Sequence, residues 1–143
     1  MIAIRRAHSW ECDAISSIAH ANRQALGFIP RSWLAEAVRK REVIVAVDSE
    51  SVVGFARFHI TRKGQCTLYE IAVRDDARGK GVGRALIEEL ARIASAHGAS
   101  HILAKCPEGL PANGFYVHLG FERQATERRK KRTLLVWVRK LSD

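Results

Sequence analysis

The chain has 143 residues, 47% hydrophobic and 27% charged, which is the balance of one folded domain rather than of a disordered chain. No apolar run approaches the roughly 20 residues of a membrane-spanning helix, and the start lacks the pattern of a signal peptide, so we expect a single cytoplasmic domain over residues 1–143 without membrane contact. A net charge of +9 predicts attraction to anions, without choosing among nucleotides, acidic proteins, nucleic acids and lipid head groups.

The first half of the chain alternates strand and helix patterns. A short strand is followed by two helical stretches, of which the second has Ser32 as its expected N-cap. Three strands with turns between them then form a predicted meander. The expected ranges are strand 2–6, helices 10–25 and 32–41, and strands 42–47, 52–60 and 67–73.

The second half begins with an amphipathic helix, because apolar residues recur at steps of three and four from Val82 to Ile93. Gly98 ends it, and the following segments are predicted as strand 101–106, helix 112–119, and strands 121–126 and 133–140. This order predicts an α/β (α+β) domain whose sheet is mixed and mainly antiparallel.

Neither the cysteines nor the histidines suggest a metal or disulfide framework. Cys12, Cys66 and Cys106 are odd in number and widely spaced, which indicates reduced, buried thiols. The six histidines do not pair with each other or with cysteine at metal-ligand spacing, so no metal site is predicted. Cys106 is followed by Pro107 with no evident partner base, so a core thiol is favoured over a nucleophile.

A glycine-rich turn between residues 69 and 86 carries the clearest chemical signal. Alternating glycines let the backbone approach a ligand, and the N-terminus of the following helix adds N–H donors and partial positive charge. Basic side chains in and beside the turn would neutralise phosphate. Known phosphate loops of the P-loop and dinucleotide types fit the spacing poorly, and a simple strand-to-helix connection is the alternative. The turn consists of Arg78, Gly79, Lys80, Gly81, Val82, Gly83 and Arg84.

Two motifs give the chain a resemblance to a known family. Arg78-x-x-Gly81-x-Gly83, preceded by the strand Tyr69-Glu70-Ile71-Ala72-Val73, resembles the acetyl-CoA-binding motif of the GNAT superfamily of N-acetyltransferases. Downstream, residues 112–121 (ANGFYVHLGF) are similar to the closing helix of that family. The resemblance implies a central sheet of about seven strands flanked by about four helices, and acetyl transfer from acetyl-CoA directly to a primary amine, with no acyl-enzyme.

The resemblance also implies where acetyl-CoA binds. The pyrophosphate would lie on the backbone of residues 78–84, and the pantetheine arm along Ile71, Ala72 and Val73. Asn113 is a candidate contact of the arm or a helix cap. The sequence departs from a common family pattern here, since it has Gly109 where many members have an asparagine.

Glu70 is the candidate base that removes a proton from the acceptor amine. A carboxylate between the apolar residues of a strand is unusual and calls for a reason. The alternative is an ion pair with a neighbouring arginine, such as Arg57 on the adjacent strand. Tyr116 is the candidate acid, because a phenol of pKa about 10 can protonate a departing thiolate of pKa about 8.5. Its alternative is an aromatic core residue flanked by Phe115 and Phe121.

The acceptor is less defined than the donor. Phe28, Ile29 and Trp33 are expected to pack against the sheet rather than to line a substrate pocket. Three interpretations of the basic run 128–132 stay open. It is a solvated hairpin turn without a further role, it guides an acidic peptide or protein, or it contacts the RNA of an aminoacyl-tRNA. A non-catalytic module that binds CoA or RNA is the alternative from another functional class. Strand edges in this fold also allow a homodimer.

Overall fold

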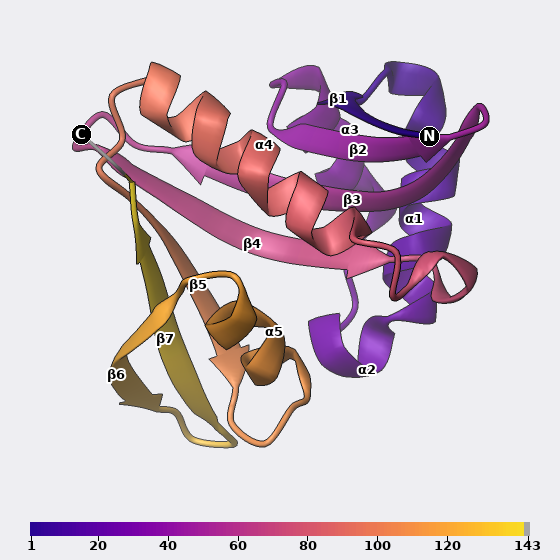
Figure 1. Ribbon diagram of the computed structural model, residues 1–143. Helices are drawn as coiled ribbons and strands as arrows, with labels where there is room; N and C mark the ends of the chain where they lie inside the picture. The colour runs from indigo at the N-terminus through magenta and orange to yellow at the C-terminus, as the bar shows by residue number, and fades with distance from the viewer. Residues whose placement is uncertain (142–143) are drawn as a thin grey trace. The chain divides into compact units, whose positions relative to one another are not determined.

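The computed structural model describes residues 1–141, which form a seven-stranded mixed sheet with five α-helices and two short 3-10 helices (Figure 1). The strand order is β1-β2-β3-β4-β5-β7-β6, with β4 and β5 parallel, which confirms the predicted fold class and strand number. The strands are β1 Ile2–Arg6, β2 Val43–Asp48, β3 Ser51–Ile60, β4 Gln65–Val73, β5 His101–Pro107, β6 Glu122–Arg128 and β7 Thr133–Lys140. The helices are η1 Ser9–Glu11, α1 Cys12–Ala21, α2 Arg23–Leu26, α3 Arg31–Arg39, η2 Asp75–Ala77, α4 Val82–Ala96 and α5 Ala112–His118.

The described chain forms two compact units, each built from two stretches of sequence. Unit 1 contains residues 1–58 and 70–90, and unit 2 contains residues 59–69 and the chain from residue 91. The single domain expected over residues 1–143 stays a prediction.

The first predicted helix is broken, which is why five α-helices replace the expected four. Asn22 leaves helical geometry at φ −108° and ψ 20°, and its side-chain amide donates to the Ile18 carbonyl at 2.8 Å. The segment 10–25 is therefore divided among η1, α1 and α2. Ser32 was also wrongly expected to cap the next helix: α3 begins one residue earlier, with Pro30 at the N-cap.

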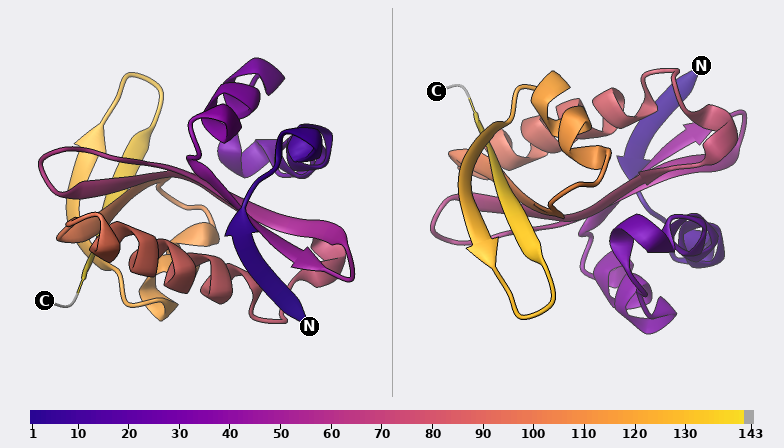
Figure 2. Two further views of the ribbon diagram at one scale, coloured as in Figure 1. Left: turned by 90° about the horizontal axis from the view of Figure 1, so that it is seen from above. Right: turned by 90° about the horizontal axis from the view of Figure 1, so that it is seen from below.

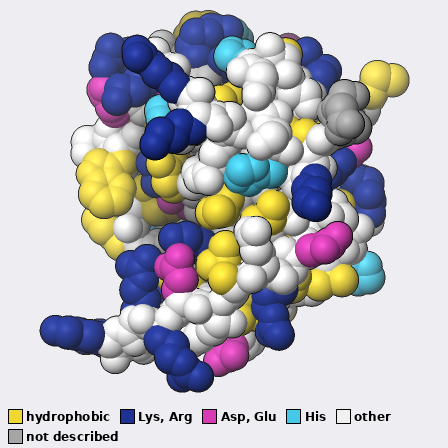
Figure 3. Space-filling view, turned by 90° about the vertical axis from the view of Figure 1, so that its left-hand side faces the viewer, with side chains coloured by type: hydrophobic (Ala, Val, Ile, Leu, Met, Phe, Trp, Pro, Cys, Tyr) yellow, Lys and Arg dark blue, Asp and Glu magenta, His cyan; other side chains and the backbone are white. Residues whose placement is uncertain are grey.

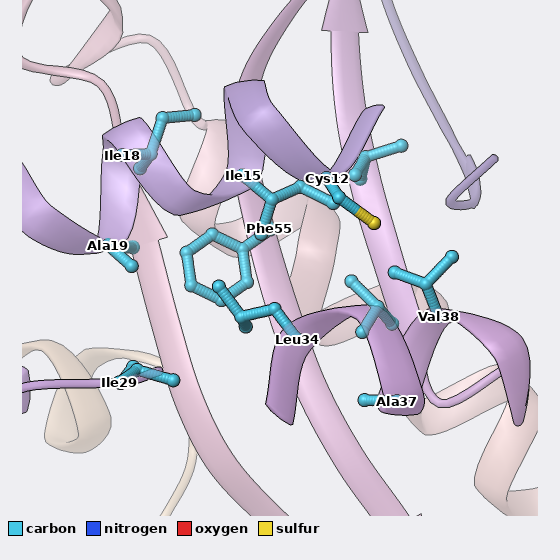
Figure 4. Packing of buried hydrophobic residues seen from close by; sticks show 12 residues of the cluster. Cys12, Ile15, Ile18, Ala19, Ile29, Leu34, Ala37, Val38 and Phe55 are labelled. Carbon is cyan, nitrogen blue, oxygen red and sulfur yellow. The ribbon is translucent and has the colours of Figure 1, made fainter. Parts of the chain in front are cut away.

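The core of unit 1 lies between α1, α3 and one face of the sheet (Figure 4). Ile15 and Leu34 are fully buried and lie beside the ring of Phe55 from β3. Ala72 of β4 belongs to the same cluster, so Phe55 and Ala72 mark the face of the sheet that α1 and α3 cover. Removal of these apolar side chains from water stabilises the unit.

The first half of α4 covers the opposite face of the unit 1 sheet (Figure 2). Gly54 of β3 permits this packing, because a Cβ there would lie 3.1 Å from the Ala72 carbonyl oxygen and 3.2 Å from a Val82 methyl. The turn that precedes α4 is thus attached to a helix held closely against β3.

Unit 2 is built on β5, which has a neighbouring strand on each side. The parallel ladder with β4 runs from Gln65–His101 to Leu68–Ala104, and the antiparallel ladder with β7 spans all of β5. The strand predicted at 121–126 is longer in the structure, and its register with β7 shifts between Arg123 and Ala125. Tyr116 of α5 packs against Phe121 and Trp137.

The expectation for the apolar residues near α2 was wrong for two of the three. Ile29 is buried in the unit 1 cluster, but 82% of Phe28 and 56% of Trp33 is exposed. Phe28 and Ile29 lie in the short connection between Gly27, which has φ 76°, and Pro30, the N-cap of α3. None of the helices within residues 1–141 is long and apolar enough to cross a membrane.

Candidate active site

The glycine turn of unit 1 joins β4 to α4 through η2. Gly79 and Gly81 have φ values of 76° and 81°, a region that side chains with a Cβ rarely adopt. A Cβ built at either position meets nothing within 4 Å, so the backbone there is open to an approaching ligand. Helix α4 starts at Val82, directly after this turn, and the first N–H groups of a helix have no acceptor within the helix. An open backbone before a helix N-terminus is compatible with the predicted binding of an anion, which stays a prediction.

The Arg78 side chain forms hydrogen bonds and an ion pair with other residues of unit 1. Its guanidinium donates to Asn22 Oδ1 at 2.5 Å and to the Val73 carbonyl at 3.4 Å, and pairs with Asp75 at 3.1 Å. The Arg78 side chain is 55% exposed and still links the turn to Asn22 and to β4. Lys80 and Arg84 are exposed as well. Asn22 was missed by sequence reasoning, because 56 residues separate it from Arg78.

The second half of β4 extends past its ladder with β5. That ladder ends at Leu68, and Ile71, Ala72 and Val73 follow in the strand. Ala72 is buried on the face under α1 and α3, and its two neighbours are half-buried. Cofactor binding by these three residues and by residues 78–84 stays a prediction.

Glu70 forms the ion pair that the sequence offered as an alternative. Its Oε1 accepts from Arg57 Nε at 2.6 Å and its Oε2 from Arg57 Nη2 at 2.7 Å, a two-bond fork. The Glu70 and Arg57 side chains are 11% and 18% exposed. Strand alternation places them on the same face as Ala72 and Phe55, toward α1 and α3. The contact with Arg57 is thus confirmed, and the base role stays a prediction.

Tyr116 belongs to unit 2, where it is 6% exposed within an aromatic cluster. Its ring packs edge-on against Phe115 and Phe121, with centroids 5.6 and 5.2 Å away, and stacks with Trp137 at 6.2 Å. The aromatic neighbours hold the ring in one orientation. The acid role of the hydroxyl stays a prediction.

The Asn113 side chain forms its hydrogen bonds within unit 2. Its amide nitrogen donates to the carbonyls of Pro107 and Leu110, both at 3.0 Å, and its oxygen accepts from Trp137 Nε1 at 2.8 Å. It does not cap α5, whose N-cap is Pro111. Because both amide hydrogens are committed, the predicted cofactor contact could use only the second lone pair of its oxygen.

The cysteines are buried free thiols, as expected. Burial raises the pKa of Cys66 to about 12 and also raises the pKa of Cys106, so little thiolate forms at neutral pH. This agrees with a core role for Cys106 rather than a nucleophilic one. Residues 1–141 contain no group of three or more His, Cys, Asp and Glu side chains that could hold a metal ion.

The basic run 128–132 comprises the last residue of β6 and the β6–β7 turn of unit 2. All five side chains are exposed, and Arg128 pairs with Thr133 across the end of the ladder. Glu127 pairs with Arg129 and Lys105, so its carboxylate neutralises only part of this charge. Lys and Arg side chains also outnumber Asp and Glu over the face shown in Figure 3.

The sequence matches the model of the Acetyltransferase (GNAT) family over residues 4–121, which is most of the chain and includes the glycine turn and α5. The chain belongs to this family. The predicted resemblance is therefore confirmed, and with it the assignment of the GNAT protein as an acyltransferase. A comparison with curated proteins gave no match.

Solved structures show the same fold at low sequence identity. Ard1 from Thermoplasma volcanium is 18% identical with a TM-score of 0.89, covering 99% of each chain. The putative acetyltransferase yncA from Salmonella typhimurium, solved with its cofactor acetyl-CoA, is 22% identical with a TM-score of 0.83, covering 100% of this chain and 95% of that one. A ribosomal-protein-alanine N-acetyltransferase from Brucella melitensis is 25% identical with a TM-score of 0.77, covering 97% and 99%.

Proposed function

We propose that this GNAT protein transfers the acetyl group of acetyl-CoA directly to a primary amine of a peptide, a protein or a small molecule. The observation that carries the proposal is the open turn at Gly79 and Gly81, which leads into the N-terminus of α4. An open backbone at a helix N-terminus suits the pyrophosphate of a nucleotide-bearing donor. The acetyl-CoA in the yncA structure supports the same donor.

The chemistry depends on proton transfer both at the acceptor nitrogen and at the departing thiolate. An alkyl amine of pKa about 10 is mostly protonated at neutral pH, so it must lose a proton before its nitrogen attacks the thioester carbonyl. The C–N bond forms and the C–S bond breaks; the nitrogen loses its second proton, and the departing thiolate takes one up. Glu70 is the proposed base and Tyr116 the proposed acid.

The charge of the β6–β7 turn favours an acceptor with anionic groups. Unit 2 places this turn next to the loop that leads into α5, because the Glu108 N–H donates to the Thr133 carbonyl at 2.9 Å. Tyr116 lies on α5, so the basic turn and the proposed acid are connected through one short loop. A peptide or protein segment with Asp or Glu near its reactive amine would be attracted there. The Brucella protein, named for a ribosomal protein, is a similar structure whose name gives a protein acceptor.

Turnover assays with acetyl-CoA test this function. The protein would be incubated with acetyl-CoA and a panel of amines: small polyamines, neutral peptides and acidic peptides. Release of free CoA together with a product heavier by one acetyl group supports the proposal. Tyr116→Phe should lower kcat by about 10²-fold, the usual size of an acid–base contribution. Acetyl-CoA binding without acetylated product across the panel would instead indicate a non-catalytic binding module. Binding of RNA that weakens steeply with salt, without acetyl-CoA turnover, would indicate an RNA-binding protein.

A further inference from the structure

The ion pair between Arg57 and Glu70 constrains the proposed base more than an ordinary surface pair would. Both guanidinium-to-carboxylate distances are below 2.8 Å, and both side chains are largely shielded from water. Phe55 and Ala72, two residues away along β3 and β4, are buried apolar neighbours on the same face. In such surroundings water screens the charges weakly, so the pair is held firmly.

The two-bond fork fixes the plane of the Glu70 carboxylate in addition to balancing its charge. A glutamate side chain has three rotatable bonds, and a single hydrogen bond would leave it free to turn. Two parallel N–H···O bonds hold both oxygens at once, a geometry that a lysine ammonium does not reproduce. A carboxylate has about four lone-pair sites, of which Arg57 takes two, so each oxygen keeps one site for a proton or a water.

We propose that Arg57 is a positioning residue, which holds the Glu70 carboxylate in the orientation that accepts the proton of the acceptor amine. This inference rests on the proposed function. The acceptor ammonium gives one proton, directly or through one water, to a Glu70 oxygen whose second site is bound to Arg57. The neutral amine then attacks the thioester carbonyl, and the C–S bond breaks as the C–N bond forms. The amide nitrogen loses its second proton, the thiolate takes one up, and Glu70 returns its proton to solvent, so one proton is released overall.

The competing role is purely mechanical, with the pair joining β3 to β4. The two roles differ in whether the orientation of the pair matters. If the ion pair only links the strands, it should work equally well with the glutamate on β3 and the arginine on β4. A proton acceptor would not, because the exchange moves the carboxylate to the position of Arg57.

Four variants separate these roles: Arg57→Lys, Arg57→Gln, Glu70→Gln, and the exchange Arg57→Glu with Glu70→Arg. The assay measures kcat, the KM of the amine, the KM of acetyl-CoA and the melting temperature. We expect Glu70→Gln to lower kcat by about 10²-fold or more. A misplaced catalytic group can cost about 10²-fold, so we expect a loss near that size for Arg57→Gln and about tenfold for Arg57→Lys. The KM of acetyl-CoA should change little. The exchange should melt higher than the single variants that lose a charge, yet have a kcat no higher than Glu70→Gln.

Arg5 provides a matched control within unit 1. It forms a similar two-bond fork with Glu11, both bonds at 2.9 Å. Arg5→Lys should lower the melting temperature by an amount similar to Arg57→Lys but leave kcat within about twofold of the wild type, since that pair lies outside the proposed machinery.

Several results would overturn the inference. A kcat near that of the wild type in the exchanged variant would mean that the pair only links the strands. An equal loss of kcat in Arg5→Lys and Arg57→Lys would mean that the loss reflects lower stability of the protein rather than positioning by Arg57. An unchanged kcat in Glu70→Gln would mean that Glu70 is not the base. If Arg57→Gln does not fold, Arg57→Lys and the exchange decide the question. Failure of the proposed function is distinguishable, because the wild-type protein itself would then show no turnover.

Discussion

Replacing Gly81 by glutamate separates the backbone requirement of the turn from its role in binding. Gly81 has φ 81°, and a side chain in this left-handed region costs roughly 1–2 kcal/mol. Its Cβ position is open, so no clash adds to that cost. At about 4 °C per kcal/mol for a chain of this size, the Gly81→Glu protein should melt about 4–8 °C lower than the wild type.

The same substitution should abolish acetyl-CoA binding. A carboxylate next to the N-terminus of α4 occupies the approach of the pyrophosphate and repels its charge. Acetyl-CoA at 100 times its dissociation constant stabilises a protein by about 2.7 kcal/mol, which corresponds to a shift of about 10 °C in the wild type. The shift should vanish in Gly81→Glu.

Gly98 supplies the matched control, because it has φ 82° and an equally open Cβ position at the end of α4. The Gly98→Glu protein should melt lower than the wild type by a similar amount, but acetyl-CoA should raise its melting temperature as much as it does in the wild type. Differential scanning fluorimetry of the three proteins, with and without millimolar acetyl-CoA, measures both effects. An equal shift in Gly81→Glu and Gly98→Glu would refute the placement of the pyrophosphate at this turn.

Three further predictions concern stability, thiol chemistry and the acceptor. The fork with Arg5 holds the pKa of Glu11 below its usual value near 4.5, so its stabilising contribution is present at neutral pH and is lost as pH falls through the lowered pKa. Glu11→Gln should therefore cost about 2 kcal/mol at pH 7, the usual size for hydrogen bonds to a charged group, and denaturation between pH 7 and 3 should show this difference shrinking on the acid side; a constant difference would contradict the ion pair. Because burial raises its pKa to about 12, Cys66 should resist alkylation by iodoacetamide at pH 8 for hours in the folded protein and react within minutes in guanidinium, as followed by mass spectrometry; rapid labelling of folded protein would disagree. The double variant Lys130→Ser and Lys131→Ser should raise the KM of an acidic peptide several-fold at low salt and leave that of a neutral peptide unchanged, whereas equal changes for both peptides would argue against electrostatic guidance.

The chain's own sequence predicted most of the strands and helices in their order along the chain, and the glycine-rich turn before α4. Both depend on local information: period-two and period-3.6 patterns define strands and helices, and alternating glycines before an amphipathic helix define an open backbone turn. Glu70 was conspicuous for the same reason, as a carboxylate within an apolar strand. Local pattern was insufficient at Asn22, where the side chain bonds to the preceding helical turn and ends α1.

Tertiary structure decided which partner each polar side chain has. Arg57 was one candidate partner for Glu70, but only the register of β3 beside β4 brings the two groups into a fork. Arg78 reads in the sequence as a phosphate ligand, yet the fold brings Asn22 and Asp75 to its guanidinium. The physical reason is that hydrogen bonds between distant segments depend on the packing of whole elements, which a local pattern of residues does not contain. Sequence therefore determined the elements and the turn, and packing determined the contacts of the side chains placed around them.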